Sequence, residues 1–571
     1  MLGHTVNSLS FETRNEKVLL MIGSRFIQTL QQTPARLEFG AVKLVFHFGF
    51  WIVALLIGLA SGVAAVGFRL AIEWLQKTAY GTPDVNRLHS FAETLAWYWV
   101  VLIPTIGGVI VGIIFHTLTK DGRVRSVADV IEAAALHEGR VEQKEGIASA
   151  LASLITLSTG GSAGREGPVV HIAALISSKA CEWIGARGIT ARDLLGCGVA
   201  AAVAASFNAP IAGALFALEV VLRHFALHAF APIVIASVAG AVINQIAFGD
   251  VREFNLPVTS QLEFYAELPA FMILGLVCGA IAVVLMKSIF FADDVAGRVQ
   301  SRLGLPRWLR PSVAGFLLGL LAIKFPMIIG VGYETTFAAL NGQIVMDVAI
   351  LFVAVKVLAV AITMGGRMGG GVFSPSLMIG ALTGLAFGEI ATSVLPHLSG
   401  GASIYAMAGM AAVAASVLGA PISTTLIVFE MTGDWQTGLA VLVAVSMASA
   451  LSAKFVEKSF FLTQLARRKI NLAAGPQDYL LTLFKNVAIM RPLNEPKTEH
   501  WDMVEHGAYV GEHGTLAGAM PVFRRTGARY VPVLRLGAQG DTNQIIGLLY
   551  EVDALRAYNE ALAATAAEEH S

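Results

Sequence analysis

Long apolar segments recur along most of the chain, from about Leu44 to Lys458, and short stretches rich in glycine, proline or polar residues interrupt them. Apolar segments of this kind enter or cross a lipid bilayer as helices. Several are shorter than the roughly 20 residues that a full crossing needs, which predicts half-helices whose ends meet inside the membrane. The predicted segments are residues 44–78, 96–119, 144–160, 167–186, 192–206, 208–223, 226–249, 265–291, 308–326, 346–364, 374–396, 402–417, 420–433 and 436–455.

The apolar region contains an internal repeat, because residues 198–219 match residues 409–430 without a gap. Repeated halves with broken helices are an architecture of transporters, whose substrate site lies at the interface of the repeats near the middle of the membrane. We therefore expect an all-α polytopic membrane domain over residues 41–470, with repeat halves at about 44–250 and 265–470.

The composition changes on both sides of this domain. Residues 1–40 carry several basic residues but no apolar core with a cleavage site, so we expect a cytosolic N-terminal segment without a signal peptide. Residues 471–571 are mixed and polar, which predicts a cytosolic α/β tail. Its predicted elements are a helix over Thr515–Arg525, strands over Arg529–Leu534 and Ile545–Tyr550, and a helix from Val552.

The overall composition supports a membrane protein. Hydrophobic residues make up 55% of the 571 residues and charged residues 14%, and the mean hydropathy is +0.67. The net charge of zero gives no reason to expect a nucleic-acid partner. Cys181, Cys197 and Cys278 lie in apolar surroundings without paired spacing, so we interpret them as core residues and expect no metal site.

A carboxylate at the start of an apolar segment is the first candidate for function. Glu166 lies within Gly164-Arg165-Glu166-Gly167-Pro168, and an acidic residue inside the membrane commonly has a functional role. Residues 369–375 of the second half also place glycines and then a proline at a helix start. Free N–H groups and the positive end of the helix dipole bind anions there. The expected anion-binding residues in the two segments are Gly164, Arg165, Gly167 and Gly371.

The Glu166 carboxylate can occupy the site that the anion needs. Protonation removes its charge, so the side chain can leave and couple anion passage to protons. The alternative is that Glu166 caps its helix or pairs with Arg165. The chain has no zinc-binding His-Glu-x-x-His helix and no nucleophile elbow, so we do not expect an enzyme.

Taken together, these motifs resemble the CLC family of chloride channels and chloride/proton exchangers. The matching pieces are residues 164–168, 207–219, 330–333, Lys356, residues 370–375 and residues 419–430. The resemblance implies the CLC fold, a homodimer with one anion pore in each subunit, Glu166 as the external gate, and chloride as the transported ligand. It also implies that the backbone amides of Val372 and Phe373 bind the central anion. At the positions of Glu219 and Glu430 it implies helix-end or packing contacts.

Two positions depart from the family pattern. The inner proton-carrying glutamate of the exchangers corresponds to Val220, and the anion-binding tyrosine corresponds to Phe461. Neither side chain has the missing carboxylate or hydroxyl. The sequence therefore favours channel-like or weakly proton-coupled anion transport, and the alternative is a chloride/proton antiporter with a non-standard inner route.

The sequence leaves two alternatives for each of two further features. CLC proteins have a loop whose serine hydroxyl binds the anion. In an alignment with that loop, Arg125 takes the position of the serine and Ser126 follows it, so either residue is a candidate for the pore wall. His171 lies a little more than one turn into the helix after Glu166. It is either a proton relay or a packed histidine.

The tail over about residues 505–560 resembles a CBS motif, which implies either adenine-nucleotide binding or a structural contact in the dimer. No other cofactor is expected. Both termini are expected on the cytosolic side, and the multi-pass domain is expected in the inner membrane of a bacterium. A receptor that works mainly through its tail is a further alternative.

Overall fold

A computed structural model gives the structure of the chain. It describes residues 38–225, 227–249, 266–394, 396, 399–470, 472, 481, 484–493, 495–535 and 544–569. Most of the expected N-terminal segment, residues 1–37, and residues 473–480 of the tail lie outside the described residues.

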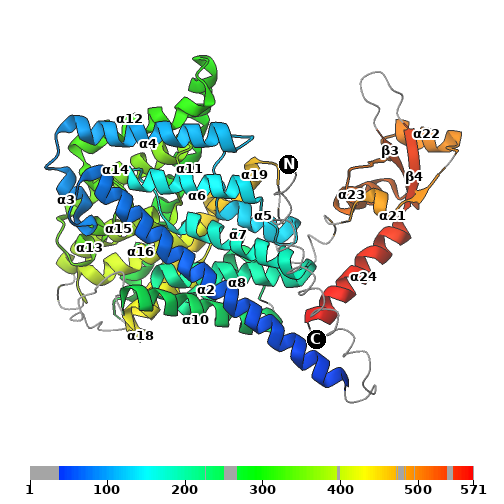
Figure 1. The fold of residues 1–571 in the computed structure, drawn as a ribbon, viewed down its shortest axis with the longest axis horizontal. Coiled ribbons are helices and arrows are strands. Elements are labelled where there is room, and N and C mark those ends of the chain that lie inside the picture. The colour runs from blue at the N-terminus through cyan, green and yellow to red at the C-terminus, as the bar shows by residue number, and fades with distance from the viewer. Residues whose placement is uncertain are drawn as a thin grey trace, which may run out of the picture. The chain divides into compact units, whose positions relative to one another are not determined.

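Every apolar segment predicted from the sequence forms a helix (Figure 1). The helices of the first half are α2 (Glu38–Tyr80), α4 (Trp97–Leu118), α6 (Gln143–Ser158), α7 (Glu166–Ile184), α8 (Gly188–Phe207), α9 (Pro210–Phe216) with the π-helical turn η2 (Ala217–Leu222), and α10 (Leu227–Phe248). Those of the second half are α11 (Leu268–Arg302), α12 (Arg310–Lys324), α14 (Met346–Gly365), α15 (Phe373–Val394), α16 (Ala402–Leu418), α17 (Pro421–Thr432) and α18 (Trp435–Phe455).

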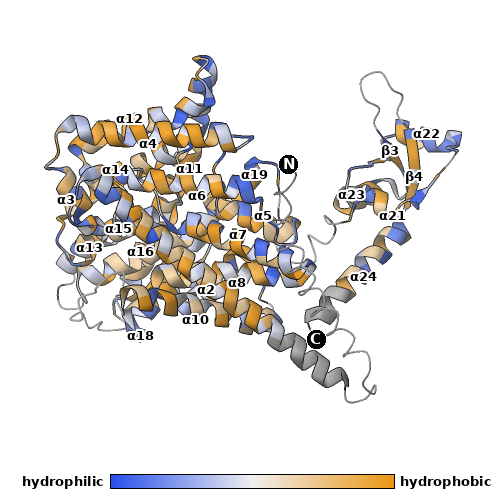
Figure 2. Cartoon of the chain, viewed as in Figure 1, coloured by the Kyte–Doolittle hydropathy of each residue, from blue (hydrophilic) through white to orange (hydrophobic). Residues whose placement is uncertain are grey.

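The described chain contains eight helices that are long and apolar enough to cross a membrane. Figure 2 shows apolar residues along most helices of the helical part. Large apolar side chains such as Ile113, Val284 and Phe291 are exposed in the isolated chain. Such side chains face lipid in a polytopic protein, so the fold is that of a multi-pass membrane protein.

The internal repeat is visible in the helix ends. Helix α8 is followed by Asn208 and α16 is followed by Gly419, both in the left-handed backbone conformation. Helix α9 then begins at Pro210 and α17 begins at Pro421. The same break therefore occurs at the same point in each half.

The two repeats also cap one another. The carboxylate of Glu219 accepts hydrogen bonds from the backbone N–H groups of Ile422 and Ser423 at the start of α17, at 2.9 and 2.8 Å. The carboxylate of Glu430 accepts hydrogen bonds from the N–H groups of Ile211 and Ala212 at the start of α9, at 2.9 and 2.7 Å. The helix-end contact expected of both glutamates is confirmed.

Several short elements were not predicted from the apolar pattern. Helix α5 begins after Ser126, whose backbone N–H donates to the Asp129 carboxylate at 2.7 Å. It has only ten residues, so its apolar pattern is too brief to stand out. The unpredicted elements are η1 (Val85–Arg87), α3 (Leu88–Ala92), α5 (Val127–Leu136), η3 (Arg307–Leu309), η4 (Pro326–Ile328), α13 (Tyr333–Leu340) and α19 (Phe460–Arg467).

The tail forms a small α/β unit of its own. Its four-stranded sheet has the order β1-β4-β3-β2, in which β3 pairs antiparallel with β4 and parallel with β2. Leu516 and Phe523 of α23 pack against Val531 and Leu549 of the sheet. The four elements predicted from the sequence are confirmed. The elements are α21 (Asn486–Ile489), β1 (Arg491–Pro492), α22 (Thr498–Glu505), β2 (Val510–Gly511), α23 (Leu516–Thr526), β3 (Tyr530–Arg535), β4 (Gln544–Tyr550) and α24 (Glu551–Glu569).

Candidate anion site

The two glycine-containing segments meet at a short antiparallel bridge between Gly164 and Gly371. The N–H of Gly164 donates to the carbonyl of Gly371 at 2.7 Å, and the N–H of Gly371 donates to the carbonyl of Gly164 at 2.8 Å. The neighbouring Gly370 has a φ of +123°, which favours glycine. The bridge brings the starts of α7 and α15 together, so two positive helix ends face one region.

A small cavity lies beside these helix starts. Its volume is about 20 Å³, which is room for one water-sized particle. Ser126 at the start of α5 and Phe461 of α19 form part of its wall. The lining residues are Ser126, Val127, Glu166, Gly167, Val170, Val203, Phe216, Met364, Gly370, Gly371, Val372, Phe373, Phe460, Phe461 and Gln464.

Glu166 lies at the junction of α7 and α15, and its side chain is 3% exposed. One carboxylate oxygen accepts hydrogen bonds from the hydroxyls of Tyr333, at 3.0 Å, and Ser374. Within the described chain, the other oxygen is buried without a hydrogen-bond partner. The carboxylate therefore reaches across to the first turn of α15, where an anion would also find the positive end of a helix.

Ser126, Val372 and Phe373 surround the same cavity from two helix starts. The first N–H groups of an α-helix have no partner within their own helix, so the amides at the start of α15 can bind an anion. The Ser126 hydroxyl is 3.5 Å from the side-chain oxygen of Gln464. Among the described residues the lining has no arginine or lysine, so dipoles would hold an anion here and the anion could still leave.

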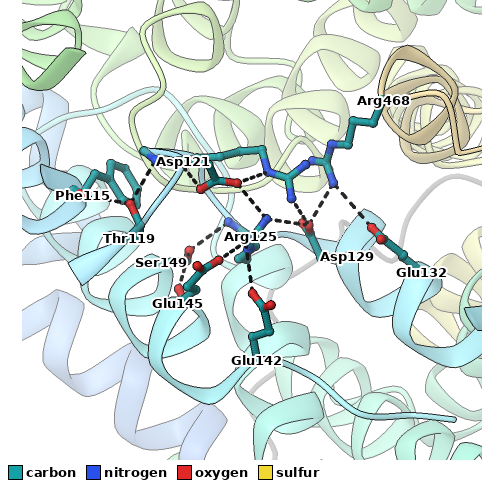
Figure 3. Close-up of polar contacts among 12 residues, drawn as sticks. Phe115, Thr119, Asp121, Arg125, Asp129, Glu132, Glu142, Glu145, Ser149 and Arg468 are labelled. Carbon is teal, nitrogen blue, oxygen red and sulfur yellow. Dashed lines mark hydrogen bonds and ion pairs between the residues drawn. The ribbon is translucent and has the colours of Figure 1, made fainter. Parts of the chain in front are cut away.

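Arg125 does not line this cavity. Its guanidinium pairs with Asp121 and Asp129 in its own segment and with two carboxylates at the start of α6 (Figure 3). The partners include Glu142 at 3.2 Å and the buried Glu145. The interpretation in which Arg125 faces the pore is wrong in this structure, because these carboxylates hold its charge and Ser126 occupies the wall.

Other expected anion ligands also need correction. The N–H groups of Gly164 and Gly371 each donate to the carbonyl of the other residue across the bridge, so neither is free for an anion. The guanidinium of Arg165 lies over the ring of Tyr333, with 4.9 Å from its central carbon to the ring centroid. Arg165 lines a separate cavity with Glu73, His89 and Glu334. Gly167 lines the anion cavity as expected.

Val220 and Phe461, the two residues that depart from the family pattern, lie in different parts of the structure. Phe461 lines the cavity and is 5% exposed. Val220 is buried in the π-helical turn η2 and is not part of the cavity wall. The described residues contain no group of His, Cys, Asp or Glu side chains that could hold a metal ion.

Three residues of the site escaped the sequence analysis. Tyr333 and Ser374 donate to Glu166, and Gln464 lines the cavity beside Ser126. Tyr333 and Ser374 lie within segments that match the CLC family. The match pointed to these segments but did not indicate that the two hydroxyls contact Glu166. Gln464 belongs to α19, a short helix without a distinctive motif.

The chain matches the family described as voltage gated chloride channel over residues 107–453. It is 31% identical over 398 residues to a putative chloride channel protein ClcB-like of Ralstonia nicotianae, covering 69% of this chain and 91% of the relative. It is 30% identical over 429 residues to the voltage-gated ClC-type chloride channel ClcB of Escherichia coli O81, covering 73% and 98%.

A plant relative is longer. The chain is 30% identical over 427 residues to the chloride channel protein CLC-f of Arabidopsis thaliana, covering 70% of this chain and 53% of the plant protein. The chain thus spans about half the length of that relative.

Solved structures share the fold. A slow cyanobacterial Cl⁻/H⁺ antiporter superposes with a TM-score of 0.65 at 22% identity, covering 73% of this chain and 97% of the antiporter. A eukaryotic CLC transporter superposes with a TM-score of 0.64 at 19% identity, covering 89% and 98%. With the family match over residues 107–453, these findings identify the chain as a member of the voltage gated chloride channel family, the CLC family.

Proposed function

We propose that the chain transports chloride or a similar small anion across the membrane through the cavity beside Glu166. The observation that carries this proposal is the position of the Glu166 carboxylate, which accepts hydrogen bonds from Ser374 at the start of α15 and from Tyr333 at the start of α13. A carboxylate there competes with an anion for the same helix end. Its protonation and departure open the path, so Glu166 is the gate.

The anion ligands in this proposal are the backbone N–H groups of Val372 and Phe373 and the hydroxyl of Ser126. These groups belong to two helix starts on the cavity wall. Dipolar groups replace part of the hydration shell of the anion without trapping it. Chloride is the transported ligand, and the transport itself needs no cofactor.

Transport is channel-like or only weakly coupled to protons. Val220 has no group that carries a proton, and Phe461 has no hydroxyl to hold the anion at the inner side of the cavity. The second candidate is a chloride/proton antiporter that takes its inner protons by another route. A polar cavity that ends at His171 supports this candidate.

The two candidates differ in the proton movement that a chloride gradient drives. The full chain is reconstituted in liposomes loaded with chloride, and chloride efflux and proton uptake are recorded together. Channel-like transport gives chloride efflux with little proton uptake. A fixed ratio of protons to chloride, with protons moving against their own gradient, contradicts the channel-like proposal and supports the antiporter.

The homodimer and the cytosolic termini are part of the same proposal. Apolar side chains in the first turns of α9 and α17, such as Ile211 and Ile422, are 57% and 46% exposed in the single chain. A second copy of the chain would cover such residues. The tail is proposed as a CBS-like unit, with adenine-nucleotide binding or a dimer contact as its role.

A further inference from the structure

A second, polar cavity lies next to the anion site and ends at His171. Its volume is about 190 Å³, which is room for several water molecules. It lies between α5, the turn that follows α5, and α7. Its lining residues are Arg123, Arg125, Asp129, Glu132, Ala133, His137, Arg140, Val141, Glu142 and His171.

The cavity runs from solvent to the interior. The side chain of Glu142 is 72% exposed, and that of His137 is 57% exposed. His171 is 1% exposed. Water therefore enters at the turn between α5 and α6 and reaches a buried imidazole at the inner end.

The ring of His171 lies at this inner end, and its two nitrogens lack hydrogen-bond partners of ordinary geometry within the described residues. The backbone of Ser126 lies within reach of the ring. The ring also packs closely on Gly146, where a Cβ atom would come within 2.8 Å of Nε2. A buried imidazole without partners is costly, and cavity water can supply the missing hydrogen bonds.

The imidazole lies between the two cavities. Val170 lines the anion cavity and the next residue, His171, lines the polar cavity. Ser126, whose backbone approaches the ring, lines the anion cavity as well. His171 follows Glu166 by five residues on α7, a rise of about 7.5 Å along the helix axis.

Several charged side chains around the polar cavity form ion pairs (Figure 3). Arg125 pairs with Asp121, Glu142 and Glu145, and Arg468 pairs with Asp129 at 2.9 Å. At the rim, the interaction with the Glu132 carboxylate, 3.6 Å from the ring, raises the pKa of His137. The charged and titratable groups facing His171 and the polar cavity are Asp121, Arg123, Arg125, Asp129, Glu132, His137, Arg140, Glu142, Glu145 and Arg468.

We propose that His171 relays protons between the polar cavity and Glu166. One ring nitrogen accepts a proton from cavity water, and the other releases its proton to water that leads to the Glu166 carboxylate. The imidazole returns to its starting form when its proton moves back to the first nitrogen or the ring turns over. This relay bypasses Val220. The inference rests on the proposed function, in which Glu166 is the gate.

The test records chloride current from the full chain in excised membrane patches, with the pH changed on one side at a time. The wild-type current responds to the pH of both sides. His171→Asn loses the response on the side of the polar cavity and retains both chloride current and the response on the other side. The matched control is His116→Asn, because His116 is an exposed histidine on α4, outside both cavities. It leaves both responses unchanged.

Each other result overturns the inference. A His171→Asn current that still follows the pH on both sides excludes the relay. If His171→Asn carries no current, His171→Gln is measured, and failure of both variants means that His171 acts through packing alone. A wild-type current that responds to pH only on the gate side also overturns the relay but leaves the proposed function intact. Absence of any wild-type chloride flux overturns the proposed function itself.

Discussion

Arg125 and Ser126 are neighbours in the chain but have opposite surroundings. The guanidinium of Arg125 pairs with Glu145, which is buried, while Ser126 faces the anion cavity. Removing one member of a buried ion pair leaves an uncompensated charge, which costs about 3 kcal/mol or more. Arg125→Ala is therefore expected to lower the free energy of unfolding by about 3 kcal/mol, measured by denaturation in mixed micelles.

Ser126→Ala is the matched comparison. It is expected to weaken chloride binding about tenfold, because a hydrogen bond to a charged group contributes about 1.5 kcal/mol or more. Its stability should change little. Chloride binding is measured by calorimetry on the purified full chain. A Ser126→Ala variant that binds chloride normally, together with an Arg125→Ala variant that is stable but binds poorly, would reverse these roles.

Phe461 offers a gain of function at the residue scale. Its ring lines the cavity but has no donor, so Phe461→Tyr supplies a hydroxyl to the anion. The expected result is an increase in chloride affinity of up to about tenfold, with slower flux because release is slower. Phe460→Tyr is the control for the position of the hydroxyl, because Phe460 also lines the cavity but its ring stacks on Phe290. An equal gain in both variants would mean that the position of the hydroxyl does not matter.

At the scale of elements, Glu219 and Glu430 fasten the two repeats together. Each carboxylate holds the first N–H groups of a helix in the other half. Glu219→Ala leaves the N–H groups of Ile422 and Ser423 without this acceptor, at a cost of about 2 kcal/mol. The free energy of unfolding should fall by that amount. Glu430→Ala should give a matching loss, and a loss in only one of the two variants would contradict the reciprocal arrangement.

The sequence predicts the long elements well because apolar length is a strong signal. All the apolar segments, the repeat and the four elements of the tail were predicted from it. Helix α5 was missed because ten residues carry too little periodic signal, although it positions Ser126. Glu166 stood out as a charge inside an apolar region, whereas Tyr333 and Gln464 are uncharged and gain their roles only from distant contacts.

The fate of Arg125 also depends on distant contacts. Its partners Glu142 and Glu145 come from α6 and the residue before it. No local pattern pairs these glutamates with Arg125. The sequence alone therefore could not decide whether Arg125 or Ser126 lines the pore. The hydrogen bonds between Gly164 and Gly371 likewise join residues that are far apart in the chain. The sequence therefore could not show that their N–H groups are already bonded and cannot bind an anion.

At the scale of the whole molecule, the tail is separable from the anion site. It has its own sheet and its own buried core. No residue after Gln464 lines the anion cavity among the described residues. A chain that ends at Lys469 is therefore expected to keep wild-type chloride flux in liposomes. Loss of flux in a truncated chain that still elutes as a folded particle would assign the tail a direct part in transport.

The central claim is that the Glu166 carboxylate gates the anion path by gaining and losing a proton. The most direct measurement is chloride flux through the reconstituted full chain as a function of pH, for the wild type and for Glu166→Gln. The amide that this substitution introduces cannot ionise, so flux through the variant should be independent of pH, whereas wild-type flux should rise as the pH falls. A Glu166→Gln variant that keeps the wild-type pH dependence would contradict the claim.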